Sequence, residues 1–144
     1  MPIDNILTII YSIMCTSNYF TAADLIKSHT ARLRQINNQP SEEIMKELEM
    51  TACKMNVIGL YAQMLGATIQ VTSGYRCEEL NKIVGGVKTS LHMQGRAADF
   101  VVSDNKIKHE LYVSLASQEA RERLRICELI EHKTYIHIGF MKSR

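Results

Sequence analysis

Residues 134–140, Thr-Tyr-Ile-His-Ile-Gly-Phe, have the clearest strand pattern in the chain. Ile136, Ile138 and Phe140 alternate there with other residues, as the apolar side of a half-buried strand does. The segment before it, residues 124–131, is either the end of a helix or another strand. We favour a hairpin that turns at His132-Lys133, because this arrangement pairs two short segments and predicts an antiparallel sheet.

The rest of the chain predicts two further strands and several helices. Residues 67–72 and 97–102 alternate and are rich in β-branched or small residues, so we interpret them as strands. Residues 42–65 have apolar positions close to a 3.6-residue period, after a capping Ser41 and before Gly66, which indicates one long amphipathic helix. Shorter helices are predicted from Thr21, over residues 77–84, and from Asp104 in pieces to about residue 123. The predicted fold class is α+β, with N-terminal helices packed on one face of a small, mainly antiparallel sheet.

Length and composition limit the kind of protein this is. The 144 residues fit a single domain, 1–144, and 17 basic against 15 acidic residues are too balanced to favour a nucleic-acid partner. Residues 6–15 form the only N-terminal apolar stretch, which is too short to span a membrane and lacks the basic flank of a signal peptide. We expect this stretch to be a buried helix or strand, and the protein to be made in the cytoplasm without export. The four cysteines form no C-x-x-C unit and are expected to be reduced thiols: Cys15, Cys53, Cys77 and Cys127.

Three residues could together hold a metal ion. Strand alternation places Asp99 on the face opposite Phe100, and His137 on the face opposite Ile136 and Ile138. His92 lies in the preceding loop, and Gly95 lets the backbone turn back toward the sheet. Two imidazoles and one carboxylate, with no obvious fourth ligand, are typical of a catalytic site for one zinc ion. The alternative is that these are unrelated polar residues of two strands and a loop.

The same residues carry a resemblance to a known family. The chain resembles the zinc D-alanyl-D-alanine carboxypeptidase and murein endopeptidase family, particularly its small phage-associated branch, over about residues 20–140. The matching segments are Ser73-Gly-Tyr-Arg76, Leu80-Asn81, Val84-Gly-Gly86, Lys88-Thr-Ser90-x-His92-x-x-Gly95-x-Ala97-Ala-Asp99, Glu128-Leu-Ile130 and Tyr135-Ile-His137-Ile138. The resemblance implies a fold like that of the Hedgehog and D-Ala-D-Ala peptidase proteins. It also implies that His92, Asp99 and His137 bind zinc.

The resemblance further implies that Arg76 and Ser90 line the substrate pocket, with Arg76 also taking part in catalysis. Members often have an acidic general base three residues before the last histidine ligand, but here that position is Thr134. In the predicted hairpin Glu128 faces His137, so we expect Glu128 to act as the base, with Glu131 as the second candidate. A one-residue change of register would reverse that choice.

These features predict a zinc metallopeptidase that hydrolyses a peptide bond in the peptidoglycan stem or cross-bridge. The absence of an export signal suits a phage endolysin, which reaches the cell wall once another protein opens the membrane, and we favour a monomer. The alternative is a zinc-containing peptidoglycan-binding or phage structural module that has lost its base. A third reading, a cytoplasmic D-Ala-D-Ala dipeptidase, would need a closed pocket sized for a dipeptide. His29, His109 and His132 are assigned no role.

Overall fold

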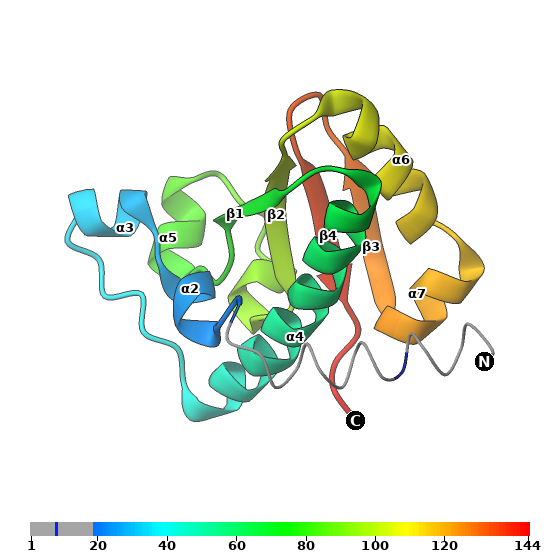
Figure 1. Ribbon diagram of the computed structural model, residues 1–144. Coiled ribbons are helices and arrows are strands. Elements are labelled where there is room, and N and C mark those ends of the chain that lie inside the picture. The colour runs from blue at the N-terminus through cyan, green and yellow to red at the C-terminus, as the bar shows by residue number, and fades with distance from the viewer. Residues whose placement is uncertain (1–7, 9–18) are drawn as a thin grey trace.

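The protein folds around a four-stranded sheet in which every neighbouring pair is antiparallel (Figure 1). The structure, a computed structural model, describes Thr8 and residues 19–144. The strand order is β1-β2-β4-β3, and the strands are β1 (Ile69–Ser73), β2 (Ala97–Val102), β3 (Ile126–Glu131) and β4 (Ile136–Phe140). The prediction for residues 6–15 falls outside the described residues except at Thr8, and Cys15 falls outside them as well.

Three helices cover one face of this sheet and build the main core. They are α4 (Glu42–Leu65), α6 (Asn105–Leu115) and α7 (Gln118–Leu124). Met55 of α4, Leu111 of α6 and Leu124 of α7 are buried in one cluster with Phe100 of β2 and Ile138 of β4. The predicted α+β class is therefore confirmed, and the single long helix has the predicted bounds.

The remaining elements lie at the end of the sheet near β1 (Figure 1). They are α2 (Ala22–Ile26), α3 (His29–Leu33), α5 (Glu78–Ile83) and the 3-10 helix η1 (Leu91–Gln94). Leu25 of α2 packs with Leu48 and Ala52 of α4 and with Tyr75 in a second buried cluster. This cluster fixes the turn after β1, because the Tyr75 N–H donates to the Leu25 carbonyl at 2.7 Å.

Glycine is required at two positions of this region. A Cβ atom on Gly74 would lie 2.3 Å from the Leu25 carbonyl oxygen, so only glycine lets the turn approach α2. Gly95 has φ +72° and ends η1, and its carbonyl accepts a hydrogen bond from Thr51 Oγ1 of α4 at 2.7 Å. The two glycines hold the turn after β1 and helix η1 against the helical layer.

The hairpin of β3 and β4 differs from the predicted one. The predicted turn at His132-Lys133 is wrong, since the His132 N–H donates to the Tyr135 carbonyl at 2.8 Å and the two residues between them are Lys133 and Thr134. Ile130 consequently pairs with His137, and Glu128 pairs with Gly139, a shift of two residues. The predicted register is therefore corrected, although the side chain of Glu128 stays on the predicted face.

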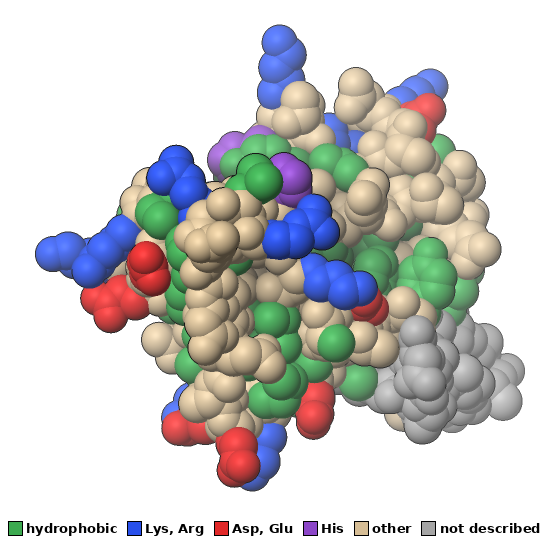
Figure 2. Space-filling view, turned by 90° about the vertical axis from the view of Figure 1, so that its left-hand side faces the viewer, with side chains coloured by type: hydrophobic (Ala, Val, Ile, Leu, Met, Phe, Trp, Pro, Cys, Tyr) green, Lys and Arg blue, Asp and Glu red, His purple; other side chains and the backbone are tan. Residues whose placement is uncertain are grey.

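Two general properties of the surface bear on partners. None of the described helices is both long enough and apolar enough to cross a membrane. The face seen in Figure 2 carries basic and acidic side chains together, and no stripe of one sign crosses it. Among the described residues, Cys53, Cys77 and Cys127 form no disulfide bond.

Candidate metal centre

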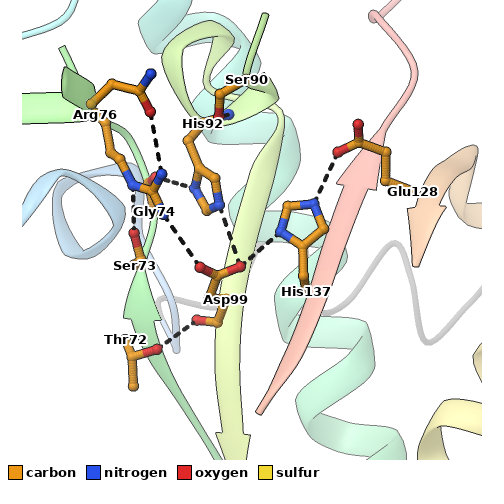
Figure 3. A network of polar contacts seen from close by, with 10 residues as sticks. Thr72, Ser73, Gly74, Arg76, Ser90, His92, Asp99, Glu128 and His137 are labelled. Carbon is orange, nitrogen blue, oxygen red and sulfur yellow. Dashed lines mark hydrogen bonds and ion pairs between the residues drawn. The ribbon is translucent and has the colours of Figure 1, made fainter. Parts of the chain in front are cut away.

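The face of the sheet opposite the helical core brings together an aspartate and a histidine. Asp99 of β2 pairs directly with His137 of β4, and His137 Nδ1 lies 2.7 Å from Asp99 Oδ1 (Figure 3). Both side chains are mostly buried, with 14% and 16% of their surface exposed. Strand alternation, read from the sequence, placed them on the same face, and the structure makes them direct neighbours.

His92 joins this pair from η1. Its side chain is 4% exposed, and Nε2 lies 3.3 Å from Asp99 Oδ1. Nδ1 lies 2.7 Å from the Gly74 carbonyl, which can only accept, so Nδ1 carries the proton and Nε2 keeps its lone pair. A histidine that ligates a metal commonly donates its other N–H to a carbonyl in this way.

The charge of Asp99 suits a cation, and His137 must give up the proton on Nδ1 to bind a metal. Burial alone would raise the pKa of Asp99, but the hydrogen bonds with His137 and His92 outweigh it and lower that pKa far below its ordinary range. The hydrogen bond with Asp99 raises the pKa of His137, against the opposing effect of burial. Asp99 is thus an ionised carboxylate between two imidazoles, and it is the centre of the negative charge.

The spacing of the candidate ligand atoms also fits a metal. One atom from each of His92, Asp99 and His137 can be chosen so that all lie within 4.8 Å of one another. Zinc ligands about 2.0–2.2 Å from the ion lie roughly 3.3–3.5 Å apart in a tetrahedron. His92 Nε2 and Asp99 Oδ1 have this separation, at 3.3 Å, whereas His137 Nδ1 is closer to Asp99 Oδ1, at 2.7 Å. The donor set of two nitrogens and one oxygen is therefore compatible with a zinc ion and leaves one coordination position for solvent or substrate.

Arg76 holds the outer oxygen of Asp99. Its Nη2 lies 3.4 Å from Asp99 Oδ2, Nε donates to Ser73 Oγ at 3.1 Å, and Nη1 donates to Asn81 Oδ1 at 3.3 Å. Asn81 is 2% exposed, and its Nδ2 donates to the Val87 carbonyl at 2.9 Å. Sequence reasoning had placed Arg76 against the substrate, whereas the structure directs three of its nitrogens to neighbouring protein groups.

Asn81 and Gly86 are parts of the site that sequence reasoning did not assign. A Cβ atom on Gly86 would lie 2.0 Å from Asn81 Oδ1 and 3.0 Å from Arg76 Nη1, so a glycine is needed for that contact. Their signal in the sequence is that Leu80-Asn81 and Val84-Gly-Gly86 match the resembled family, with Gly85-Gly86 directly after the predicted helix of residues 77–84. That pattern predicted a helix end and carried no information on the Arg76 contact.

The two glutamates proposed as bases lie on opposite faces of the hairpin. Glu128 is on the metal-site face, with Oε1 2.9 Å from His137 Nε2 and 44% of its side chain exposed (Figure 3). Glu131 is on the helix-covered face, where Oε1 lies 2.9 Å from His109 Nδ1 and Oε2 lies 3.6 Å from Lys108 Nζ. The structure brings Glu128 to the site and does not bring Glu131 there.

Ser90 and Thr134 occupy different surroundings. Ser90 is 9% exposed and caps η1, since its Oγ accepts the His92 N–H at 3.2 Å. That hydroxyl still has a proton to donate toward a ligand. Thr134 is exposed in the loop between β3 and β4.

The site defines a class of protein: an α+β domain with a His-Asp-His group suited to one divalent metal ion. The chain belongs to the Peptidase M15 family, whose family model matches residues 18–139. Members of this family are zinc-dependent metallopeptidases, in agreement with the resemblance seen in the sequence. A search of curated proteins finds no match to the chain.

Proposed function

We propose that this protein is a zinc-dependent peptidase that hydrolyses a peptide bond of peptidoglycan, as a D-Ala-D-Ala carboxypeptidase or murein endopeptidase. The observation that carries the proposal is the group formed by His92, Asp99 and His137 on the open face of the sheet in a Peptidase M15 chain. A phage endolysin is the biological setting that we favour, with the peptidoglycan stem peptide or cross-bridge as substrate.

In this proposal His92 Nε2, Asp99 Oδ1 and His137 Nδ1 hold the zinc ion. When bound, zinc supplies Lewis acidity that polarises a carbonyl and activates water. Asp99 Oδ1 faces the two histidines, and Oδ2 contacts Arg76. The guanidinium therefore fixes the plane of the carboxylate. Metal-site partners of this kind orient the ligand before the substrate arrives.

Glu128 is the proposed general base. Its Oε1 is held by His137 Nε2 at 2.9 Å, and Oε2 makes no hydrogen bond with the described part of the chain. The second oxygen is therefore available to take a proton from an attacking water and return it to the leaving amine. Glu128 thereby supplies the carboxylate that Thr134 cannot provide.

Arg76 and Ser90 are the proposed substrate contacts. A guanidinium has five N–H donors, and three contacts to Ser73, Asn81 and Asp99 leave others for a peptide carbonyl or carboxylate. The Ser90 hydroxyl accepts from His92 N–H, so its own proton can be donated to the substrate. Both side chains are adjacent to the proposed ligands, which supports the proposal that they contact the reacting end of a bound peptide.

The test is digestion of purified peptidoglycan by the zinc-loaded protein, with and without a chelator, with fragment masses read by mass spectrometry. We expect chelator-sensitive release of peptide fragments whose masses identify the bond. Glu128→Gln should lower turnover by about 10²–10⁴-fold while retaining zinc, because the amide still accepts from His137 but cannot take a proton. Glu131→Gln should retain activity, since Glu131 contacts His109 and Lys108 on the other face.

A second candidate is a zinc-containing peptidoglycan-binding or phage structural module without hydrolytic activity. Two observations favour it. Thr134 stands where many relatives have the base, and Glu128 Oε1 lies 2.9 Å from Nε2 of the proposed ligand His137, a contact that can serve to hold this ligand. In that case zinc would bind stoichiometrically, wall fragments would not be released, and sedimentation with intact peptidoglycan would still remove the protein from solution. Equal turnover in wild type and Glu128→Gln would reject Glu128 as the base.

A further inference from the structure

A basic pocket lies away from the metal centre, where the C-terminal segment leaves the sheet. It has a volume of about 430 Å³, and none of its lining residues belongs to the His92, Asp99 and His137 group. It is bounded by α4, by the end of α7 and by the residues after β4, near the C label in Figure 1. Its lining residues are Met50, Lys54, Glu122, Arg123, Arg125, Ser143 and Arg144.

Lys54 is the most unusual member of this lining. It is 5% exposed, and its ammonium lies 4.8 Å above the ring of Phe140. In the described part of the chain, no carboxylate or carbonyl lies within hydrogen-bonding distance of that ammonium. Burial, and to a smaller extent the nearby Arg125, lower the pKa of Lys54, so holding this ammonium beside the Phe140 ring costs free energy.

Arg125 presents a buried, unsatisfied N–H to the same pocket. Its Nε is buried and has no hydrogen-bond partner, while Nη2 donates to the Lys142 carbonyl at 2.9 Å. Its backbone has φ +56°, a left-handed conformation at the end of α7 that glycine would adopt with less strain. Both the side chain and the backbone of Arg125 are therefore costly to the folded chain, and strain of this kind gathers at functional positions.

The neighbouring acids offset these two cations only in part. Glu47 contributes a favourable charge near Lys54, and Ser143 donates hydrogen bonds to both its oxygens and so holds it in place. Arg123 pairs with Glu119 at 3.4 Å, and Glu122 is the one carboxylate among the lining residues. With Arg123 paired to Glu119, the pocket retains Lys54, Arg125 and Arg144 against Glu122 and the nearby Glu47, which leaves a small excess of positive charge.

We propose that this pocket binds a phosphate group, with Lys54 and Arg125 as its principal donors. A guanidinium presents planar paired donors that match phosphate oxygens, and an ammonium adds a compact charge, so the two together suit a tetrahedral oxyanion. The phosphate comes either from free inorganic phosphate or from a phosphodiester in an anionic polymer of the cell envelope. Binding of this kind is independent of peptide hydrolysis at the metal centre.

The experiment measures the melting temperature of the full chain against inorganic phosphate, with sodium chloride at matched ionic strength. We expect a saturable rise with phosphate that chloride does not reproduce. Lys54→Met should melt at a higher temperature than wild type in the absence of phosphate, and should lose the phosphate-dependent rise. Arg125→Gly should behave in the same way, because it removes both the buried donor and the left-handed strain.

The exposed Lys106→Met is the matched control and should retain the wild-type response. A glycerol-phosphate polymer distinguishes the two sources: a Lys54-dependent shift with the polymer supports an envelope phosphodiester, and a shift with inorganic phosphate alone supports a free anion. The proposal is overturned by the absence of a saturable shift with either ligand. It is also overturned by an undiminished shift in Lys54→Met and Arg125→Gly. Peptidoglycan digestion by these variants reports separately on the metal centre.

Discussion

Gly86→Ala should weaken metal binding even though Gly86 touches none of the three proposed ligands. The new Cβ atom would lie 2.0 Å from Asn81 Oδ1, so the amide must leave its position against Arg76. Asn81 cannot turn freely, because it is 2% exposed and donates to the Val87 carbonyl at 2.9 Å. The displacement therefore reaches Asp99 through the Arg76 guanidinium.

The size of the effect follows from the contacts that are lost. Leaving one buried donor or acceptor unsatisfied costs about 1–3 kcal/mol of folding free energy. Loss of an outer partner of a metal ligand lowers metal affinity by about 10–100-fold. We therefore expect Gly86→Ala to bind zinc about 10–100-fold more weakly and to unfold at a lower denaturant concentration.

Gly85→Ala is the matched control. Gly85 has φ +77°, but its Cβ atom would meet nothing within 4 Å. Left-handed strain should cost about 1–2 kcal/mol of stability without moving Asn81. Zinc affinity is measured by competition with a chromophoric chelator for both variants. Equal zinc affinity in Gly86→Ala and Gly85→Ala would refute the reasoning, because the two variants differ in the contact with Asn81.

Three other predictions follow from the fold and the site. Zinc at about 100 times its dissociation constant should stabilise the protein by roughly 2.7 kcal/mol, seen as a rise in melting temperature that His92→Ala abolishes. Thr51→Val should cost about 1–3 kcal/mol in urea denaturation, because it leaves the buried Gly95 carbonyl without its 2.7 Å donor, while Thr51→Ser should not. The hydrogen bond with His109 lowers the pKa of Glu131 in the folded protein. The ionised Glu131 therefore stabilises the fold fully above the ordinary glutamate pKa of about 4.3, and this stabilisation is lost as the pH falls through the lower folded pKa. Glu131→Gln should therefore flatten the acid side of the stability profile measured between pH 2 and pH 6, and an unchanged slope would contradict this.

The metal ligands could be predicted from the sequence because the relevant pattern is local. Asp99 and His137 each lie in a strand whose apolar neighbours define the buried face, so the opposite face follows from the two-residue period. The family resemblance then joined them to His92 across 45 residues of sequence. The alternation alone did not predict that Asp99 and His137 pair directly, because pairing depends on the strand order of the sheet.

The contacts that hold Asp99 in position could not be predicted in the same way. Arg76, Asn81 and Gly86 lie in a turn, a helix and a loop, and no shared period relates their side chains. Their contacts depend on how the turn after β1 packs against α2, where the Tyr75 N–H meets the Leu25 carbonyl. Such contacts between irregular segments are visible only when the whole fold is known.

The hairpin shows why Glu128 reaches the metal-site face although the predicted register is wrong. Side chains alternate along a strand, so the observed shift of two residues preserves the face, and a shift of one would have turned Glu128 toward the helices. Glu128 now reaches His137 diagonally over Gly139, where a Cβ atom would lie 2.7 Å from its Oε1. Gly139→Ala should therefore displace Glu128 and lower both peptide hydrolysis and zinc affinity, since the carboxylate also orients His137. Glu128→Gln should lower hydrolysis alone, and a parallel loss of zinc affinity in that variant would show that Glu128 acts by holding the ligand rather than as the base.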